Sequence, residues 1–189
     1  MTAVPDDEAC VTQCILEARA RLEKALQTSK RNADSAQVLA VSKTKPATLV
    51  RAAWQSGQRA FGENYLQEAL DKQQALSDLT DIEWHFIGPI QSNKTRAIAE
   101  HFAWVHTVER EKIARRLSEQ RPDELGALDV CLQVNISGEA SKAGVTPQEL
   151  LALAETVIAL PGLRLRGLMA IPAPCAADAS DAERHAPFC

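Results

Sequence analysis

A regular alternation of helix-like and strand-like segments constrains the fold of this chain more than any other feature of its 189 residues. Apolar residues at helical spacing alternate with short apolar runs that are typical of buried strands. Strands that alternate with helices form right-handed βαβ units and a parallel sheet. The pattern therefore predicts an α/β fold with six strands, at residues 38–43, 59–62, 84–88, 104–108, 129–136 and 165–171.

The helices expected between these strands carry apolar stripes. The clearest begins at Thr146, where the sequence TPQE has the form of a capping box with proline at the first helical position. Its predicted buried stripe is Leu150, Leu153, Ala154, Val157 and Ile158. Side-chain caps are expected from Asn64 for the third helix and from Ser92 or Asn93 for the fourth, and the first helix is expected at residues 7–29.

Six strands fit either an open doubly wound sheet or a β/α barrel. No Gly-x-Gly-x-x-Gly follows the first strand, which weakens a dinucleotide-binding interpretation. A closed barrel needs eight strands and roughly 250 residues. No change in composition indicates a linker, so we expect residues 1–189 to form a single, C-terminally incomplete domain. Residues 173–189 are expected to be a polar tail or a helix cut short.

Composition narrows the classes of function. The formal net charge of -4 argues against nucleic acid as the main partner. No apolar run reaches the length of about 18 residues needed to span a membrane. Acidic residues at positions 6–8 interrupt the N-terminus, so we expect no signal peptide. These observations predict a soluble, cytoplasmic protein.

The cysteines do not indicate a metal site. There are five, and their spacing matches no metal-binding motif. Cys10 and Cys14 lie on one helical face without a histidine beside them, so a structural role is expected for both, as small buried side chains. Cys131 is expected in the core, and Cys175 and Cys189 in the tail.

The first predicted strand ends in a basic segment, because residues 38–46 read VLAVSKTKP. A cation at the end of a buried strand is costly unless it has a task or a partner. The carboxyl ends of strands in parallel α/β folds are where ligands bind. A desolvated lysine has a lowered pKa and attacks carbonyl groups. Two interpretations follow: Lys43 is a Schiff-base lysine, or the strand ends in a solvated basic turn.

Further polar residues are predicted at the same end of the sheet. Asn135 follows the fifth strand, and the loop at 137–144 is small and glycine-rich, which suits either a ligand-covering loop or an ordinary turn. With Lys94 and Lys142, three lysine-bearing loops would attract a phosphate or carboxylate ligand. His85 and His106 are isolated strand histidines, expected to be hydrogen-bonded in the core or at its mouth.

Several motifs, taken in order, carry a family resemblance. They are LAVSKTKP at 39–46, FGENY at 61–65, WHFIG at 84–88, QSNK at 91–94 and GLMAIP at 167–172. Over about residues 8–174 the chain closely resembles the YggS/PROSC family of pyridoxal phosphate homeostasis proteins. The resemblance implies the barrel domain of alanine racemase without its second domain, here with about six strands.

The resemblance also implies a cofactor and a role. Lys43 matches the lysine that binds pyridoxal 5'-phosphate (PLP) as a Schiff base. Family members are monomers that bind PLP reversibly without turnover, buffer its free level and pass it to apo-enzymes. Asn64, His85, Asn135 and Met169 lie at ends of strands that should line the cofactor pocket.

The chain departs from the family at its C-terminal part. Neither the Ser-x-Gly-Met-Ser motif nor the Arg-Ile-Gly motif of the last family strands occurs here. In such barrels the loops after strands seven and eight hold the phosphate. We therefore expect a shortened form that keeps the lysine and lacks the phosphate cradle.

Three alternatives to a cofactor carrier remain. A two-base racemase needs a second acid/base group opposite the lysine, and Tyr65 is the one tyrosine of the chain. A Schiff-base aldolase needs carboxylates at the barrel mouth, and Glu63 is the candidate. The third alternative is a fragment with weak cofactor binding, whose lysine still reacts with aldehydes.

Six strands cannot close an eight-stranded barrel, so two strand edges are expected to lack partners. We predict low stability, aggregation or domain swapping when this chain is expressed alone. Thermal melting followed by circular dichroism, together with size-exclusion chromatography, checks this. A cooperative melt of a monomer at high temperature would contradict it.

Overall fold

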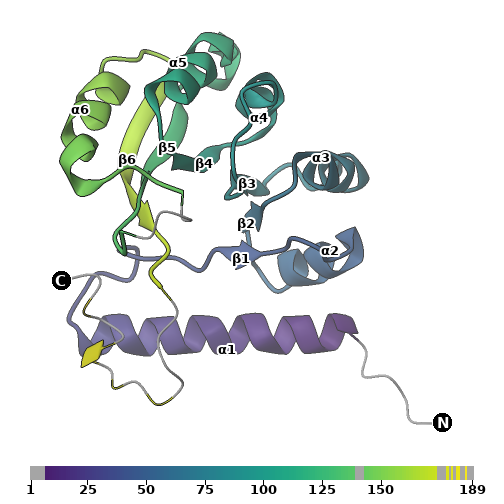
Figure 1. The fold of residues 1–189 in the computed structure, drawn as a ribbon. Helices are drawn as coiled ribbons and strands as arrows, with labels where there is room; N and C mark the ends of the chain where they lie inside the picture. The colour runs from purple at the N-terminus through teal and green to yellow at the C-terminus, as the bar shows by residue number, and fades with distance from the viewer. Residues whose placement is uncertain are drawn as a thin grey trace. The chain divides into compact units, whose positions relative to one another are not determined.

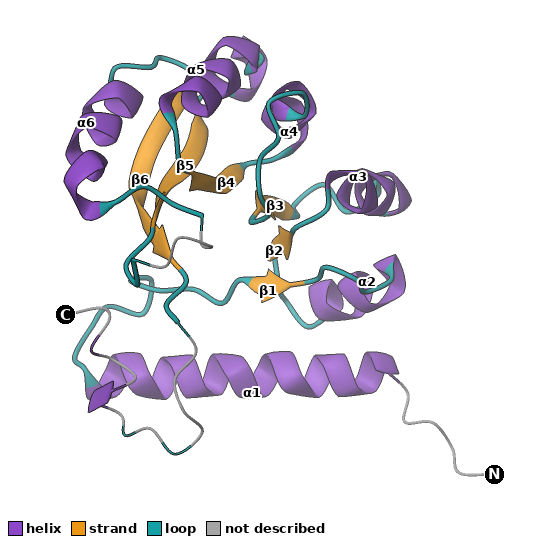
Figure 2. Cartoon of the chain, viewed as in Figure 1, coloured by secondary structure: helices purple, strands orange, loops and turns teal. Residues whose placement is uncertain are grey.

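The computed structural model describes residues 7–138, 143–173, 178, 180, 182–183 and 186. Strands and helices alternate along these residues after a long first helix (Figures 1 and 2). The helices are α1 (Asp7–Thr28), α2 (Ala47–Gln55), α3 (Leu66–Ala75), α4 (Thr95–His101), α5 (Glu111–Gln120) and α6 (Pro147–Ile158), with a 3-10 helix at Asp123–Leu125. The strands are β1 (Ala40–Val41), β2 (Ala60–Glu63), β3 (Glu83–Phe86), β4 (Trp104–Val108), β5 (Leu128–Val134) and β6 (Leu163–Ala170).

The strands pair in chain order, from β1 to β6, in one six-stranded sheet. The ladders β1–β2, β4–β5 and β5–β6 are parallel, as βαβ units require. Chain order is the succession of a β/α barrel, whereas a doubly wound sheet reverses its order at a switch point. The predicted α/β fold is confirmed, and among the described residues β1 and β6 each have a strand partner on one side only.

The chain divides into two compact units, residues 1–85 and 86–189. In the first unit α1 runs alongside β1 and α2 (Figure 1). Leu26 is the buried residue of α1, and on the same face of the helix Val11, Ile15, Ala18 and Leu22 are half-buried. The core of this unit contains Phe61 and Trp84, whose ring centroids lie 6.0 Å apart.

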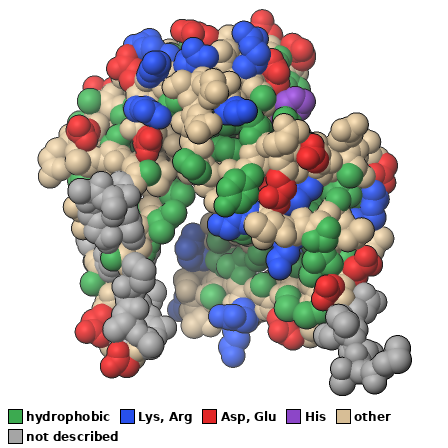
Figure 3. All heavy atoms as spheres, turned by 45° about the vertical axis from the view of Figure 1, so that its right-hand side comes forward, with side chains coloured by type: hydrophobic (Ala, Val, Ile, Leu, Met, Phe, Trp, Pro, Cys, Tyr) green, Lys and Arg blue, Asp and Glu red, His purple; other side chains and the backbone are tan. Residues whose placement is uncertain are grey.

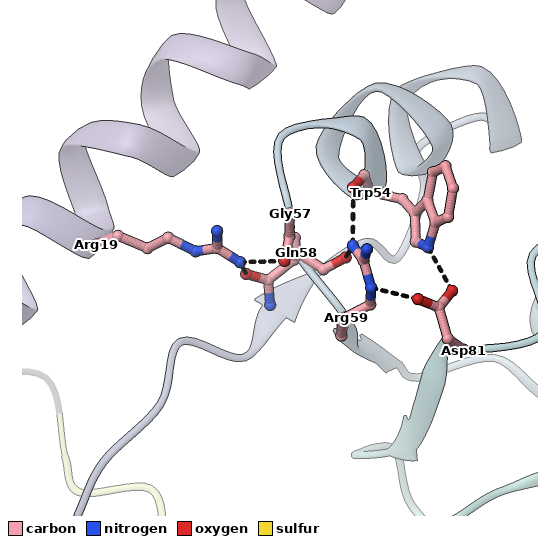
Figure 4. A network of polar contacts seen from close by, with 6 residues as sticks. All are labelled: Arg19, Trp54, Gly57, Gln58, Arg59 and Asp81. Atoms are coloured by element: carbon pink, nitrogen blue, oxygen red, sulfur yellow. Dashed lines mark hydrogen bonds and ion pairs between the residues drawn. The ribbon is translucent and has the colours of Figure 1, made fainter. Parts of the chain in front are cut away.

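Polar contacts fasten α1 to the turn between α2 and β2 (Figure 4). The Arg19 guanidinium donates to the Gly57 carbonyl at 2.6 Å and to Gln58 Oε1 at 3.1 Å. Arg59, the next residue along, donates to Asp81 Oδ2 at 2.6 Å. Arg19 also donates to the carbonyl of Ser56, the C-cap of α2, at 3.1 Å, and so satisfies a group at the open end of that helix.

The second unit buries apolar side chains of β4 and β5. Its strand residues Val105, Val108, Leu128, Val130 and Leu132 are all 0 % exposed. Polar residues interrupt the apolar runs of these strands at His106, Thr107, Asp129 and Gln133. Helix α5 buries Ile113, Ala114 and Leu117 in the same unit.

The predicted helix ends are partly right. The capping box at Thr146 is confirmed, because Thr146 Oγ1 accepts from the Glu149 amide and Glu149 accepts from the Thr146 amide. Ile158 was placed wrongly in the buried stripe, since it is 69 % exposed. It ends α6 about 100° around the helix from the buried Val157.

Two predicted caps and one strand length are wrong. Asn64 does not cap α3, whose N-cap is Tyr65. Neither Ser92 nor Asn93 caps α4, whose N-cap is Lys94. Neither helix has a side-chain cap hydrogen bond. The first strand covers Ala40–Val41 because the chain turns directly afterwards.

The face seen in Figure 3 carries Lys and Arg side chains interspersed with Asp and Glu. Among the described residues, no helix has both the length and the apolar character to cross a membrane.

Gly144 packs against the end of β5 in the second unit. Its φ is +122°, and a Cβ there would lie 2.7 Å from the Asn135 nitrogen and 2.8 Å from the Val134 carbonyl carbon. The neighbouring backbone cannot yield easily, because the Asn135 amide donates to the Val145 carbonyl at 2.9 Å. The backbone conformation and the close packing therefore require glycine at position 144.

We predict that Gly144→Ala lowers the free energy of unfolding by at least about 2 kcal/mol, from backbone strain plus a steric clash. Gly167→Ala is the matched control. Its φ lies outside the positive range and the added Cβ would meet open space, so a change of less than about 0.5 kcal/mol is expected. Urea unfolding of both variants measures the difference, and equal losses would contradict the prediction.

Candidate functional site

The turn that follows β1 presents Lys43. The Lys45 amide donates to the Ser42 carbonyl at 3.1 Å, which closes a four-residue turn with Lys43 and Thr44 at its centre. Thr44 has a φ of 63°. A left-handed conformation is rare for a β-branched residue and costs on the order of 1–3 kcal/mol. The turn therefore needs stabilising contacts from the rest of the unit.

The side chain of Lys43 is exposed. Of the two interpretations of this strand end, the exposure fits a solvated basic turn, and the Schiff base at Lys43 stays a prediction. The buried lysine here is Lys72 of α3, which is 5 % exposed and reaches the Ser42 carbonyl. The exposed Lys43 amine is accessible to a ligand, while Lys72 lies in the interior.

Lys72 is fully hydrogen-bonded in a cluster that we call the Lys72 network: Ser42, Glu63, Glu68 and Lys72. Its ammonium donates to the Ser42 carbonyl at 2.6 Å and to Glu63 Oε1 and Glu68 Oε1 at 2.7 Å each. An ammonium has three donors, so all are used. Glu63 is 0 % exposed and also accepts from Ser42 Oγ at 2.6 Å.

Glu68 joins α3 to the turn. Its Oε1 accepts a hydrogen bond from the Thr44 amide as well as from Lys72. The hydrogen bond from Lys72 is the largest cause that lowers the pKa of Glu68 below its ordinary value, with a smaller contribution from the Thr44 amide. The carboxylate is therefore held in its charged form beside the turn.

Asn64 lies next to this turn on the neighbouring strand. Val41 pairs with Gly62 and the Ser42 amide donates to the Gly62 carbonyl, so the chain segments that carry Lys43 and Asn64 leave adjacent strands side by side. Asn64 Oδ1 is buried and has no hydrogen-bond partner. A buried, unsatisfied acceptor is uncommon and is available to a donor on a ligand.

His85 lies in β3 and is 2 % exposed. Its Nε2 is 2.8 Å from Glu83 Oε1. The predicted hydrogen-bonded strand histidine is thereby confirmed.

Two predicted site residues belong to the second unit. Asn135 directly follows β5, and Met169 pairs with Gln133 in the β5–β6 ladder, so both lie toward the carboxyl ends of adjacent strands. Lys94 is exposed at the N-cap of α4. Residues 139–142, which include Lys142 and half of the predicted covering loop, lie outside the described residues.

The alternative chemistries meet specific obstacles. Glu63 is ion-paired in the interior and is not a free carboxylate at the mouth, as an aldolase would require. Tyr65 is 56 % exposed at the start of α3.

The cysteines differ from expectation in part. Cys131 is buried as predicted, and burial raises the pKa of its thiol. Cys10 and Cys14 are exposed rather than buried. Cys175 and Cys189 lie outside the described residues, and among those described no group of three or more His, Cys, Asp or Glu side chains could hold a metal ion.

Sequence reasoning missed the role of Lys72 and Glu68. The available signal was helical spacing: Lys72 follows Glu68 by four residues and the fully buried Ala69 by three, which places a lysine beside the apolar face of α3.

The fold and the lysine turn define a class of protein. Residues 18–187 match the family model for the N-terminal domain of alanine racemase. An alanine racemase from E. faecalis has the same fold, with a TM-score of 0.65 at 19% identity, over 94% of this chain and 47% of that one.

Closer relatives narrow the class to one family. A pyridoxal phosphate homeostasis protein from Pseudomonas aeruginosa is 61% identical over 178 residues, which is 94% of this chain and 76% of that protein. The structure of PipY from Synechococcus elongatus PCC7942 without PLP has a TM-score of 0.74 at 39% identity, and its structure with PLP bound has 0.71 at 37%. Both matches cover 88% of this chain and 76% of PipY. The chain belongs to the pyridoxal phosphate homeostasis protein family.

The lowered pKa of Glu68 predicts an acid-dependent loss of stability. A carboxylate with a lowered folded-state pKa stabilises the fold above its unfolded pKa of about 4.3, and this stabilisation is lost as the pH falls through the lowered value. Urea unfolding between pH 7 and pH 3 should therefore show a shallower acid loss for Glu68→Gln than for the unaltered chain. Equal slopes would contradict the prediction.

Proposed function

We propose that this chain binds PLP reversibly as a Schiff base on Lys43 and acts in PLP homeostasis. The observation that carries the proposal is the exposed Lys43 amine, presented on a braced turn at the carboxyl end of β1. PipY, which is described with PLP bound, supports the choice of cofactor.

The residues of the first unit fit this cofactor. An exposed amine can condense with an aldehyde, and Asn64 Oδ1 supplies a buried acceptor without a partner on the neighbouring strand end. His85, Asn135 and Met169 belong to the proposed lining as in the sequence-based prediction, because each lies toward the carboxyl end of its strand or just beyond it.

The proposed chemistry of the protein is a single reversible condensation at Lys43. Lys43 Nζ would hold the cofactor as a Schiff base to its aldehyde carbon, with release of one water molecule. Water or another amine reverses the linkage. When bound, PLP supplies an electron sink for amino-acid chemistry, whereas the protein supplies orientation and electrostatics.

A carrier role fits the described residues better than turnover. The Glu63 carboxylate, which accepts from Ser42 of the turn, is hydrogen-bonded to Lys72 and is not available as an acid or base. Tyr65 is exposed rather than enclosed against a reacting group. We therefore include in the proposal that the chain is non-catalytic and delivers PLP to apo-enzymes in the cytoplasm.

Borohydride trapping tests the proposal. The purified chain is mixed with PLP and reduced, and the labelled peptide is mapped by mass spectrometry. We expect stoichiometric labelling at Lys43, weaker labelling with pyridoxal, which lacks the phosphate, and loss of labelling in Lys43→Ala.

Lys45→Ala is the matched control, because Lys45 is an exposed lysine in the same turn. This variant should label Lys43 like the unaltered chain. Labelling scattered over several lysines and indifferent to the phosphate would overturn the proposal.

A further inference from the structure

We propose that Lys72, Glu63 and Glu68 are positioning residues that hold the Ser42–Lys45 turn so that the Lys43 amine meets the cofactor aldehyde. The inference rests on the proposed function of Lys43. The buried Lys72 network would thereby orient the exposed Lys43 through the backbone of the turn, without contacting the Lys43 side chain.

The contacts of the Lys72 network lie on both sides of Lys43. Before it, the Ser42 carbonyl accepts from Lys72 at 2.6 Å and Ser42 Oγ donates to Glu63 at 2.6 Å. After it, the Thr44 amide donates to Glu68. Because both flanking residues are fixed, the backbone direction of Lys43 is set by side chains from β2 and α3.

The turn needs such support. Thr44 is held at a φ of 63°, where a β-branched residue is strained. Strained residues persist where the surroundings over-determine them, and they gather at functional sites. Without the hydrogen bond to Glu68, the Thr44 backbone would be free to relax and redirect Lys43.

Stability alone does not account for this cluster. Replacing a buried ion pair by apolar residues of similar volume is often neutral or stabilising. Here Glu63 is 0 % exposed, and its Oε2 lacks a hydrogen-bond partner, so the cluster carries an unrelieved desolvation cost. A role in directing the turn gives this arrangement a function.

The experiment separates positioning of the amine from formation of the pocket. Two quantities are measured: the rate of borohydride-trappable Schiff base formation at Lys43 with PLP, and the affinity for pyridoxine 5'-phosphate, which has no aldehyde. A positioning role changes the first quantity and leaves the second unchanged. A purely structural role changes both.

Glu68→Ala is the main variant, because the Glu68 side chain is 30% exposed and its loss should leave the core folded. Asp71→Ala is the matched control: it removes an exposed side-chain hydrogen bond, from Gln67 at 2.9 Å, on the same helix. For Glu68→Ala we expect trapping to slow by about tenfold, as for the loss of a hydrogen bond to a charged group, with pyridoxine 5'-phosphate affinity unchanged. Asp71→Ala should match the unaltered chain in both quantities.

A rescue variant sharpens the test. Glycine adopts positive φ without strain, so adding Thr44→Gly to Glu68→Ala should restore much of the trapping rate. Lys72→Arg keeps the buried cation and should trap faster than Lys72→Met. If Lys72→Met fails to fold, the Glu68 pair still decides the question.

The experiment distinguishes failure of the proposed function from failure of the positioning role. Absence of Lys43 labelling in the unaltered chain would overturn the proposed function and this inference with it. Normal labelling of the unaltered chain, combined with a Glu68→Ala variant that is either unaffected or loses both quantities together, would overturn this inference alone.

Discussion

The hydrogen bonds of the buried Lys72 ammonium organise the first unit at the carboxyl ends of its strands. The ammonium gathers the Ser42 carbonyl, Glu63 and Glu68 within 2.7 Å. An isolated charge is unfavourable in an interior, and three accepting oxygens make its burial tolerable. The same oxygens belong to β2, to α3 and to the segment after β1. One cation therefore ties β2 and α3 to the segment after β1, where Ser42 lies 21 residues before Glu63 and 30 before Lys72.

Parallel strand order explains why Lys43 and the residues that hold its turn lie close together. In a parallel ladder every strand ends at the same edge, so residues that follow β1 and β2 become neighbours without any local sequence contact. Lys43 and Asn64 meet in this way, while Asn135 and Met169 do so in the second unit. The helices close each strand-to-strand connection, and α3 contributes Lys72 from its inward face.

Much of the architecture was predictable. The α/β class, the six strands, the capping box at Thr146 and the burial of Cys131 followed from periodicity and local chemistry, because these features depend on neighbouring residues. The family was recognisable from several ordered motifs. The errors lie where tertiary contacts override local preference. Asparagine is a common helix cap, yet the Oδ1 of Asn64 is buried and caps no helix. Cys10 and Cys14 remain exposed on α1.

The sequence by itself determined the alternation of strands and helices, the family, and the identity of the lysine at the end of the first strand. Only the tertiary structure decided which lysine is buried. The sequence left open whether Lys43 is desolvated or lies in a solvated turn; the structure shows it exposed, with Lys72 in the interior. The physical reason is that burial of a charge depends on acceptors supplied from elsewhere in the chain. Glu63 stands nine residues before Lys72 and Ser42 thirty residues before it, and folding alone brings them into contact.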